Sequence, residues 1–229
     1  FLALFIILSS NVLLSQSRTK TVLKQPSSQT MKAGAFIDVN TANYPQSAFS
    51  ISQLVTNVLI AGNTTCTTPN VSNVVVSPNL AASDATRSWG YFNKGTTNFP
   101  FSNGIVLTTG YANRAGNNFQ AGQLSNSVPA QGDADLAAAL NLPAGVLKDA
   151  SFIEFDFVPT ASQVSFRYLF ASEEYEGNFP CTITDGFALL LRPVSGGPYT
   201  NLAVLPGGAG PVSVTNIIPA SYGCGPKNA

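Results

Sequence analysis

The sequence predicts a mainly β protein, an antiparallel β-sandwich of jelly-roll type with one or two short helices. Short apolar runs are separated by turn residues, and the 229 residues include 19 Gly and 15 Pro. Residues 152–158 and 163–170 alternate apolar and polar side chains with the two-residue period of a half-buried strand. Because 45% of the residues are hydrophobic, the chain can form a sizeable core.

The N-terminal segment has the features of a targeting signal. Residues 1–8 are continuously apolar, and a stretch with small polar residues follows up to Ser15. This pattern is typical of a secretory signal peptide, so residues 1–15 are predicted to be an N-terminally truncated signal peptide that is cleaved before Gln16. The apolar run is too short to span a bilayer, and a buried N-terminal strand is the alternative that we favour less. Residues 16–44 are then a flexible lead-in, and residues 45–229 form the sandwich domain, which we expect to be incomplete at its C-terminus.

Two helices are predicted from apolar spacing and from capping residues. The first has an apolar stripe with helical spacing, made of Ile51, Leu54, Val55, Val58 and Leu59. Ser50 followed by Gln53 fits a capping box at its start, and Gly62 would end it. The second spans residues 133–142, with Asp133 or Asp135 as its N-cap and Pro143 as its stop.

The remaining elements are predicted to be strands. Apolar β-type runs lie at residues 71–77, 89–92, 104–109, 187–191, 201–205 and 211–218. The clearest local prediction is a hairpin in which residues 159–162 join the two alternating runs. Its register places the apolar residues on one face and one charge pair on the other, with Val158 opposite Gln163, Phe155 opposite Phe166, and Glu154 opposite Arg167.

Composition rules out several classes of function. The sequence contains no His, which removes Ser-His-Asp and Cys-His catalysis and the usual zinc sites from this chain. Lys plus Arg equals Asp plus Glu at 11 each, so there is no electrostatic case for binding nucleic acid or an anionic membrane. The three cysteines fit an oxidising compartment. We expect Cys181 to pair with Cys224, while the odd count suggests that Cys66 has its partner beyond residue 229.

An acidic loop follows the predicted hairpin and is the main functional clue. Glu173, Glu174 and Glu176 lie between two apolar runs, and Asp185 stands at the exit. Carboxylates gathered beside core strands are costly unless donors, a cation or water compensate them. Carboxylate oxygens are the ligands that Ca²⁺ prefers, so Glu173, Glu174 and Asp185, with Asp133 and Asp135, are hypothesised to bind Ca²⁺.

Other interpretations of the same residues stay open. The carboxylates could accept backbone N–H groups or pair with Arg114 or Arg167, and we favour this local compensation. Asp133 and Asp135 could simply cap a helix. Glu173 or Glu174 with Asp185 or Asp156 could form a glycosidase pair, although nothing marks a substrate cleft. Three strand aromatics could stack on a sugar, but a core position is the better interpretation for Trp89, Tyr91 and Phe92.

Several motifs together resemble the choice-of-anchor L domain of secreted bacterial proteins, found largely in Bacteroidetes. The matching stretches cover roughly residues 45–224 and are SISQLVTNVLI (50–60), FSNGIVLTTG (101–110), GDADL (132–136), FIEFDFVP (152–159), FRYLFASEEY (166–175), DGFALLL (185–191) and NLAVLPG (201–207). FASEEY followed by DGFA is the specific part.

The resemblance implies an extracellular or cell-surface module that sits upstream of further domains and of a C-terminal sorting or anchoring signal. It brings no established enzymatic activity. We therefore predict an interaction or adhesion module of a larger secreted protein, with an extracellular protein or glycan as partner. The alternatives are a carbohydrate-active domain and a purely structural spacer.

Overall fold

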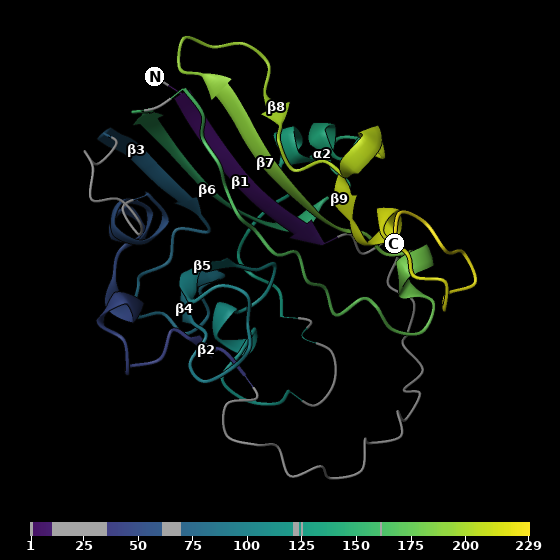
Figure 1. The fold of residues 1–229 in the computed structure, drawn as a ribbon, viewed down its shortest axis with the longest axis horizontal. Coiled ribbons are helices and arrows are strands. Elements are labelled where there is room, and N and C mark those ends of the chain that lie inside the picture. Colours follow the sequence, from purple (N-terminus) through teal and green to yellow (C-terminus); the bar gives the residue numbers. More distant parts are fainter. Residues whose placement is uncertain (1, 11–35, 61–69, 121–123, 125, 161) are drawn as a thin grey trace.

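The computed structural model describes residues 2–10, 36–60, 70–120, 124, 126–160 and 162–229. They form two antiparallel sheets (Figure 1). The large sheet has the order β3-β6-β1-β7-β8, with β9 also paired to β7; the strands are β3 Asn70–Ser77, β6 Lys148–Val158, β1 Leu2–Ser10, β7 Asp185–Pro193, β8 Thr200–Asn201 and β9 Val212–Ser213. The small sheet has the order β2-β4-β5, with β2 Asp38–Val39, β4 Trp89–Asn93 and β5 Asn103–Leu107. The predicted mainly β fold with antiparallel sheets is confirmed, whereas its jelly-roll arrangement stays a prediction.

Both predicted helices are present, and each begins at the expected cap. Helix α1 spans Ile51–Leu54 and continues as π-helical turns over Val55–Ile60. The capping box at its start is confirmed, since the Ser50 hydroxyl accepts the Gln53 N–H and the Gln53 side chain accepts the Ser50 N–H. Helix α2 spans Ala134–Ala139. Gly62, the expected end of the first helix, lies outside the described residues. None of the helices that the structure describes combines the length and the apolar character that crossing a membrane needs.

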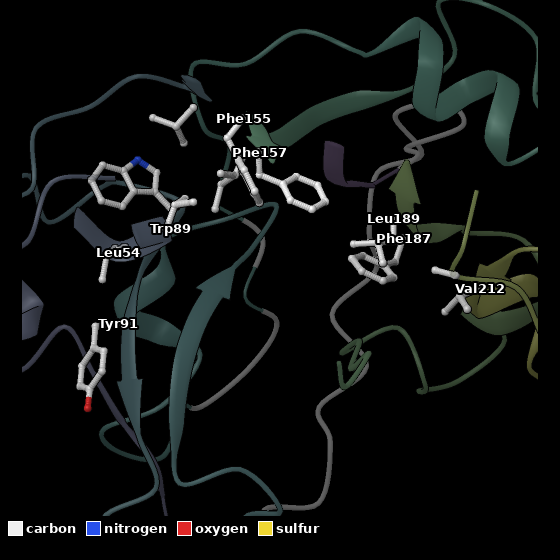
Figure 2. Packing of buried hydrophobic residues seen from close by; sticks show 12 residues of the cluster. Leu54, Trp89, Tyr91, Phe155, Phe157, Phe187, Leu189 and Val212 are labelled. Carbon is white, nitrogen blue, oxygen red and sulfur yellow. The ribbon is translucent and has the colours of Figure 1, made fainter. Parts of the chain in front are cut away.

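One hydrophobic core joins the two sheets (Figure 2). It contains Phe155 and Phe157 of β6 and Phe187 of β7 from the large sheet, and Trp89 and Tyr91 of β4 from the small sheet. The prediction that the β4 aromatics are core residues is therefore confirmed.

A second cluster covers the opposite face of the large sheet, where α2 packs. Its buried members are Leu136, Ala137, Leu140, Leu147, Ala150, Ala188 and Leu190. Strand β7 is thus buried on both faces, which explains why its sequence is a continuous apolar run instead of an alternating one.

The N-terminal apolar segment forms the central strand of the large sheet. Strand β1 is antiparallel to β6 on one side, with Leu4 opposite Phe155, and to β7 on the other, with Leu4 opposite Leu191. The structure thus contains the strand that sequence reasoning favoured less. A strand in the uncleaved chain does not test removal on export, so the signal peptide at residues 1–15 stays a prediction. Part of the expected lead-in, residues 38–39, forms β2.

The predicted hairpin between residues 152–158 and 163–170 is wrong for this structure. The first half is strand β6, but its two edges are occupied by β3 and β1, so no edge is left for residues 163–170, which form no strand. The expected pair of Glu154 with Arg167 is absent as well. Tyr199 donates to Glu154 at 3.5 Å, while the Arg167 guanidinium lies 4.8 Å from the Phe101 ring centroid.

Replacing Phe155 by Ala should strongly destabilise the protein. Phe155 is 0% exposed in the core between the two sheets, and deleting a buried Phe ring costs about 3–5 kcal/mol. Phe119→Ala is the matched control, because Phe119 is 54% exposed and should change the free energy of unfolding by less than about 0.5 kcal/mol. Urea denaturation of both variants measures this. Equal losses would contradict the described core.

Candidate functional site

The acidic loop, residues 172–184, is fastened to the C-terminal part of the chain. The predicted disulfide is confirmed, because Cys181 is bonded to Cys224. The Tyr175 hydroxyl donates to the Ile217 carbonyl at 2.8 Å, and the hydroxyls of Thr184 and Thr215 are hydrogen-bonded at 2.8 Å. Three separate contacts therefore hold the loop in one place. The third cysteine, Cys66, lies outside the described residues.

The carboxylate of Asp185, at the exit of the acidic loop, is buried and only partly hydrogen-bonded. The Ser172 hydroxyl donates to its Oδ2 at 2.5 Å, whereas its Oδ1 is buried and has no hydrogen-bond partner among the described residues. Burial raises the pKa of the Asp185 carboxyl, and the hydrogen bond from Ser172 lowers it in part. The side chain is held at the first residue of β7, so it cannot turn freely toward water.

Glu173 is held through its side chain and Glu174 through its backbone N–H. Glu173 is exposed and its Oε2 accepts the backbone N–H of Leu124 at 2.9 Å, which ties the acidic loop to the long loop after β5. The Glu174 backbone N–H donates to the Ser172 hydroxyl at 3.1 Å. Ser172 therefore links the backbone of Glu174 to the carboxylate of Asp185. Sequence reasoning missed this serine, because only its place beside the acidic run could have pointed to it.

The other predicted metal ligands lie at a helix terminus. Asp133 is the N-cap of α2, where its Oδ1 accepts the Leu136 N–H at 2.7 Å, and Asp135 is in the first turn. Burial raises the pKa of the Asp133 carboxyl, and the Leu136 hydrogen bond opposes this. The opposite end of the helix covers the acidic loop's exit, because a Cβ at Gly186 would meet Leu140 Cδ1 at 2.4 Å. Asp133 and Leu140 are about 10 Å apart along the helix axis, so the cap and the residue that contacts Gly186 lie at opposite ends of α2.

The structure therefore brings together only part of the proposed ligand set. Ser172 and Asp185 are in contact, with Glu174 beside them, whereas Asp133 and Asp135 cap α2. Within the described ranges, no group of three or more His, Cys, Asp or Glu side chains is placed to hold a metal ion. Calcium binding stays a prediction.

The alternative glycosidase pairs of Glu173 or Glu174 with Asp156 are excluded by distance, because both glutamates lie in the loop that leads to Asp185, far from Asp156. Asp156 of β6 and Arg192 of β7 both pair with Ala3 of β1, so they lie at the same level of the sheet. Asp185 lies at the other end of β7, about 23 Å along the strand from Arg192. This exceeds the about 9.5 Å that an inverting glycosidase allows between its two acids. Asp156 instead accepts a hydrogen bond from the Asn73 side chain at 2.6 Å.

Removing the disulfide should free the acidic loop. The bond joins residues 43 positions apart, and closing a loop of that length stabilises by about 2–4 kcal/mol. We expect Cys181→Ser with Cys224→Ser to lower the free energy of unfolding by that amount and to speed amide exchange in residues 172–184. Unchanged exchange in the loop would show that the disulfide does not fix it.

Neutralising Asp185 should change stability with a definite pH dependence. Its folded-state pKa is raised, so the wild type loses stability as pH rises from about 4 through that folded pKa. In chelator, the free energy of unfolding of Asp185→Asn should therefore rise relative to that of the wild type between pH 4 and pH 7.

Asp84→Asn is the control with the opposite sign. Thr86 donates its hydroxyl and its backbone N–H to the Asp84 carboxylate, and these bonds hold the pKa of Asp84 below its ordinary value. This variant should lose stability relative to the wild type as pH rises toward about 4, because the lowered pKa of Asp84 stabilises the wild type only once the carboxyl ionises, and the difference should stay level between pH 4 and pH 7. Urea denaturation over both pH ranges measures the two variants, and a loss of stability of Asp185→Asn relative to the wild type between pH 4 and pH 7 would contradict the burial of Asp185.

Comparison with known proteins supplies one match. A search of curated protein sequences found no match, and a search of solved structures found none either. A family model described as Choice-of-anchor L domain matches residues 38–229, which include the acidic loop, both described cysteines and every described strand except β1. This chain belongs to the choice-of-anchor L domain family.

Proposed function

We propose that this domain is an extracellular or cell-surface interaction module of a larger secreted protein, and that its acidic loop binds Ca²⁺. Membership of the family indicates a surface-associated module. The Cys181–Cys224 disulfide supports an oxidising compartment, because such bonds persist mainly outside the cytosol. The adhesive role, the secretion and the metal are the parts that we add as a proposal.

The observation that carries the metal proposal is the environment of Asp185. A buried carboxylate oxygen without a hydrogen-bond donor is costly, and a cation offsets that cost directly. Glu173 and Glu174 lie in the loop that leads to Asp185, and the Ser172 hydroxyl and loop carbonyls would be further hard oxygen ligands. Because Ca²⁺ takes six to eight oxygens, binding would order the loop around Asp185 and give the domain a fixed surface for its partner.

A calcium titration tests the metal. Extracellular calcium modules bind with a Kd of about 10⁻⁴–10⁻³ M, so about 10 mM Ca²⁺ should stabilise the protein by roughly 1.4–2.7 kcal/mol. Thermal unfolding in Ca²⁺ and in chelator measures the shift. Asp185→Asn should lose the response, whereas Asp156→Asn should keep it, because Asp156 lies at the far end of the sheet. Equal unfolding of the wild type in Ca²⁺ and in chelator would contradict the metal.

Export has a separate test. The chain, expressed in an export-competent bacterium behind an initiating Met and a short basic segment that completes the truncated signal, should be recovered outside the cytoplasm with Gln16 as its first residue. N-terminal sequencing of the exported protein measures this. Recovery only in the cytoplasm, with residues 1–15 retained, would contradict the proposed secretion.

A further inference from the structure

The connection between β6 and β7 is unusual for a compact domain. The described residues of the connection 159–184 contain no strand and only the short 3₁₀ turn Phe179–Cys181. Connections longer than about 12–15 residues without regular structure are uncommon, and they argue against the assignment of elements around them. The part of this connection nearest β6 is the alternating run 163–171. This run has the periodicity of a strand but forms no strand in the structure.

This run exposes apolar side chains, and its backbone has no partner among the described residues. Val164, Tyr168 and Leu169 are 45%, 42% and 50% exposed, and only Phe166 and Phe170 are half-buried against the core. Within the described part of the chain, residues 163–171 form no backbone hydrogen bond. An extended run with strand periodicity and no partner has its pairing capacity unused.

The sheet contains a position that suits this run in direction and in length. Strands β6 and β7 point the same way, and the strand between them is antiparallel to both. A strand that follows β6 through a tight turn must be antiparallel to β6, and it is therefore also antiparallel to β7. Consecutive strands are also the commonest neighbours in a sheet. The present occupant, β1, lies outside residues 38–229, the range that the family model covers.

We propose that residues 2–10 and residues 164–172 are alternative occupants of the position between β6 and β7. In the uncleaved chain β1 fills it; once residues 1–15 are removed, residues 164–172 take its place and the large sheet becomes β3-β6-(164–172)-β7-β8. This inference rests on the export that is part of the proposed function, and one arm of the test below is independent of export.

The side chains fit the position on both faces of the sheet. A turn at residues 159–162 places Val164, Phe166 and Tyr168 opposite Phe157, Phe155 and Ile153, which all belong to the core between the two sheets. On the other face, Leu169 falls opposite Phe152 and Ala188, both of which pack in the cluster under α2. Arg167 falls opposite Glu154, whose carboxyl has its pKa raised mainly by burial.

Residues of the run already contact β7, one of the two strands that would flank it. Strand β1 places Ser10 opposite Asp185, so Ser172 would stand opposite the same residue after the exchange. The Ser172 hydroxyl is already bonded to the Asp185 carboxylate, and the Tyr168 ring lies 4.9 Å from the ring of Phe187 on β7. The exchange therefore keeps one end of the run anchored and moves the remainder into the sheet.

Cysteine pairs distinguish the two occupants. In a Cys66→Ser background, Glu154→Cys with Phe5→Cys reports β1 in place, because these residues pair in the structure. Glu154→Cys with Arg167→Cys reports the exchanged strand, and Glu154→Cys with Ser165→Cys is the control two residues out of register. We expect the first pair to cross-link in the uncleaved chain. In the exported, cleaved protein the second pair should cross-link and the control should not. Equal yields for the second pair and the control would overturn the proposal.

Weakening β1 in the full chain tests the exchange without any need for export. Ile6→Pro removes a ladder donor from the interior of β1, while Leu13→Pro, outside this strand, is the matched control. With Ile6→Pro, amides of residues 164–171 should exchange at least about ten-fold more slowly than in the control, since a central strand opens only with large parts of the sheet. Unfolding of β6 and β7, or unchanged exchange at residues 164–171, would overturn the proposal.

Discussion

The large sheet depends on one strand position, the one between β6 and β7. These two strands run in the same direction and each bonds to the strand between them. With one strand removed, their backbones would stand about 9.6 Å apart, twice the spacing that a ladder allows, and both inner edges would lose their partners. Phe155 and Phe187 contribute to one core from opposite sides of this position, so the packing of the domain also depends on its being filled.

The acidic loop depends on the same position. Asp185 is the first residue of β7, and Ser172, which donates to it, follows the run that we propose as the alternative central strand. The Cys181–Cys224 disulfide and the contacts to Ile217 and Thr215 fix the far side of the loop. A strand that ends at Ser172 and a strand that begins at Asp185 would hold the carboxylates between two rigid supports. The sheet and the proposed ion site are therefore linked through a single serine–aspartate contact.

The sequence predicted correctly those features that depend on residues close together in the chain. The capping box at Ser50, the Asp133 cap of α2 and the strand character of the apolar runs depend on neighbours within a few residues, and the structure contains them. The predicted pairing of residues 163–170 with β6 is absent from the uncleaved chain, because pairing is a competition between distant segments that alternation alone does not decide. The contact of Glu173 with Leu124 joins two loops far apart in the sequence, so no local pattern could have predicted it.

Solution NMR of the exported, cleaved protein distinguishes the two occupants of the position between β6 and β7. We expect nuclear Overhauser contacts from backbone protons of Phe166 to those of Phe155 on one side and of Leu191 on the other, because the three would lie side by side in neighbouring strands. Absence of both contacts, in a protein whose β6 and β7 remain folded, would contradict the proposed exchange.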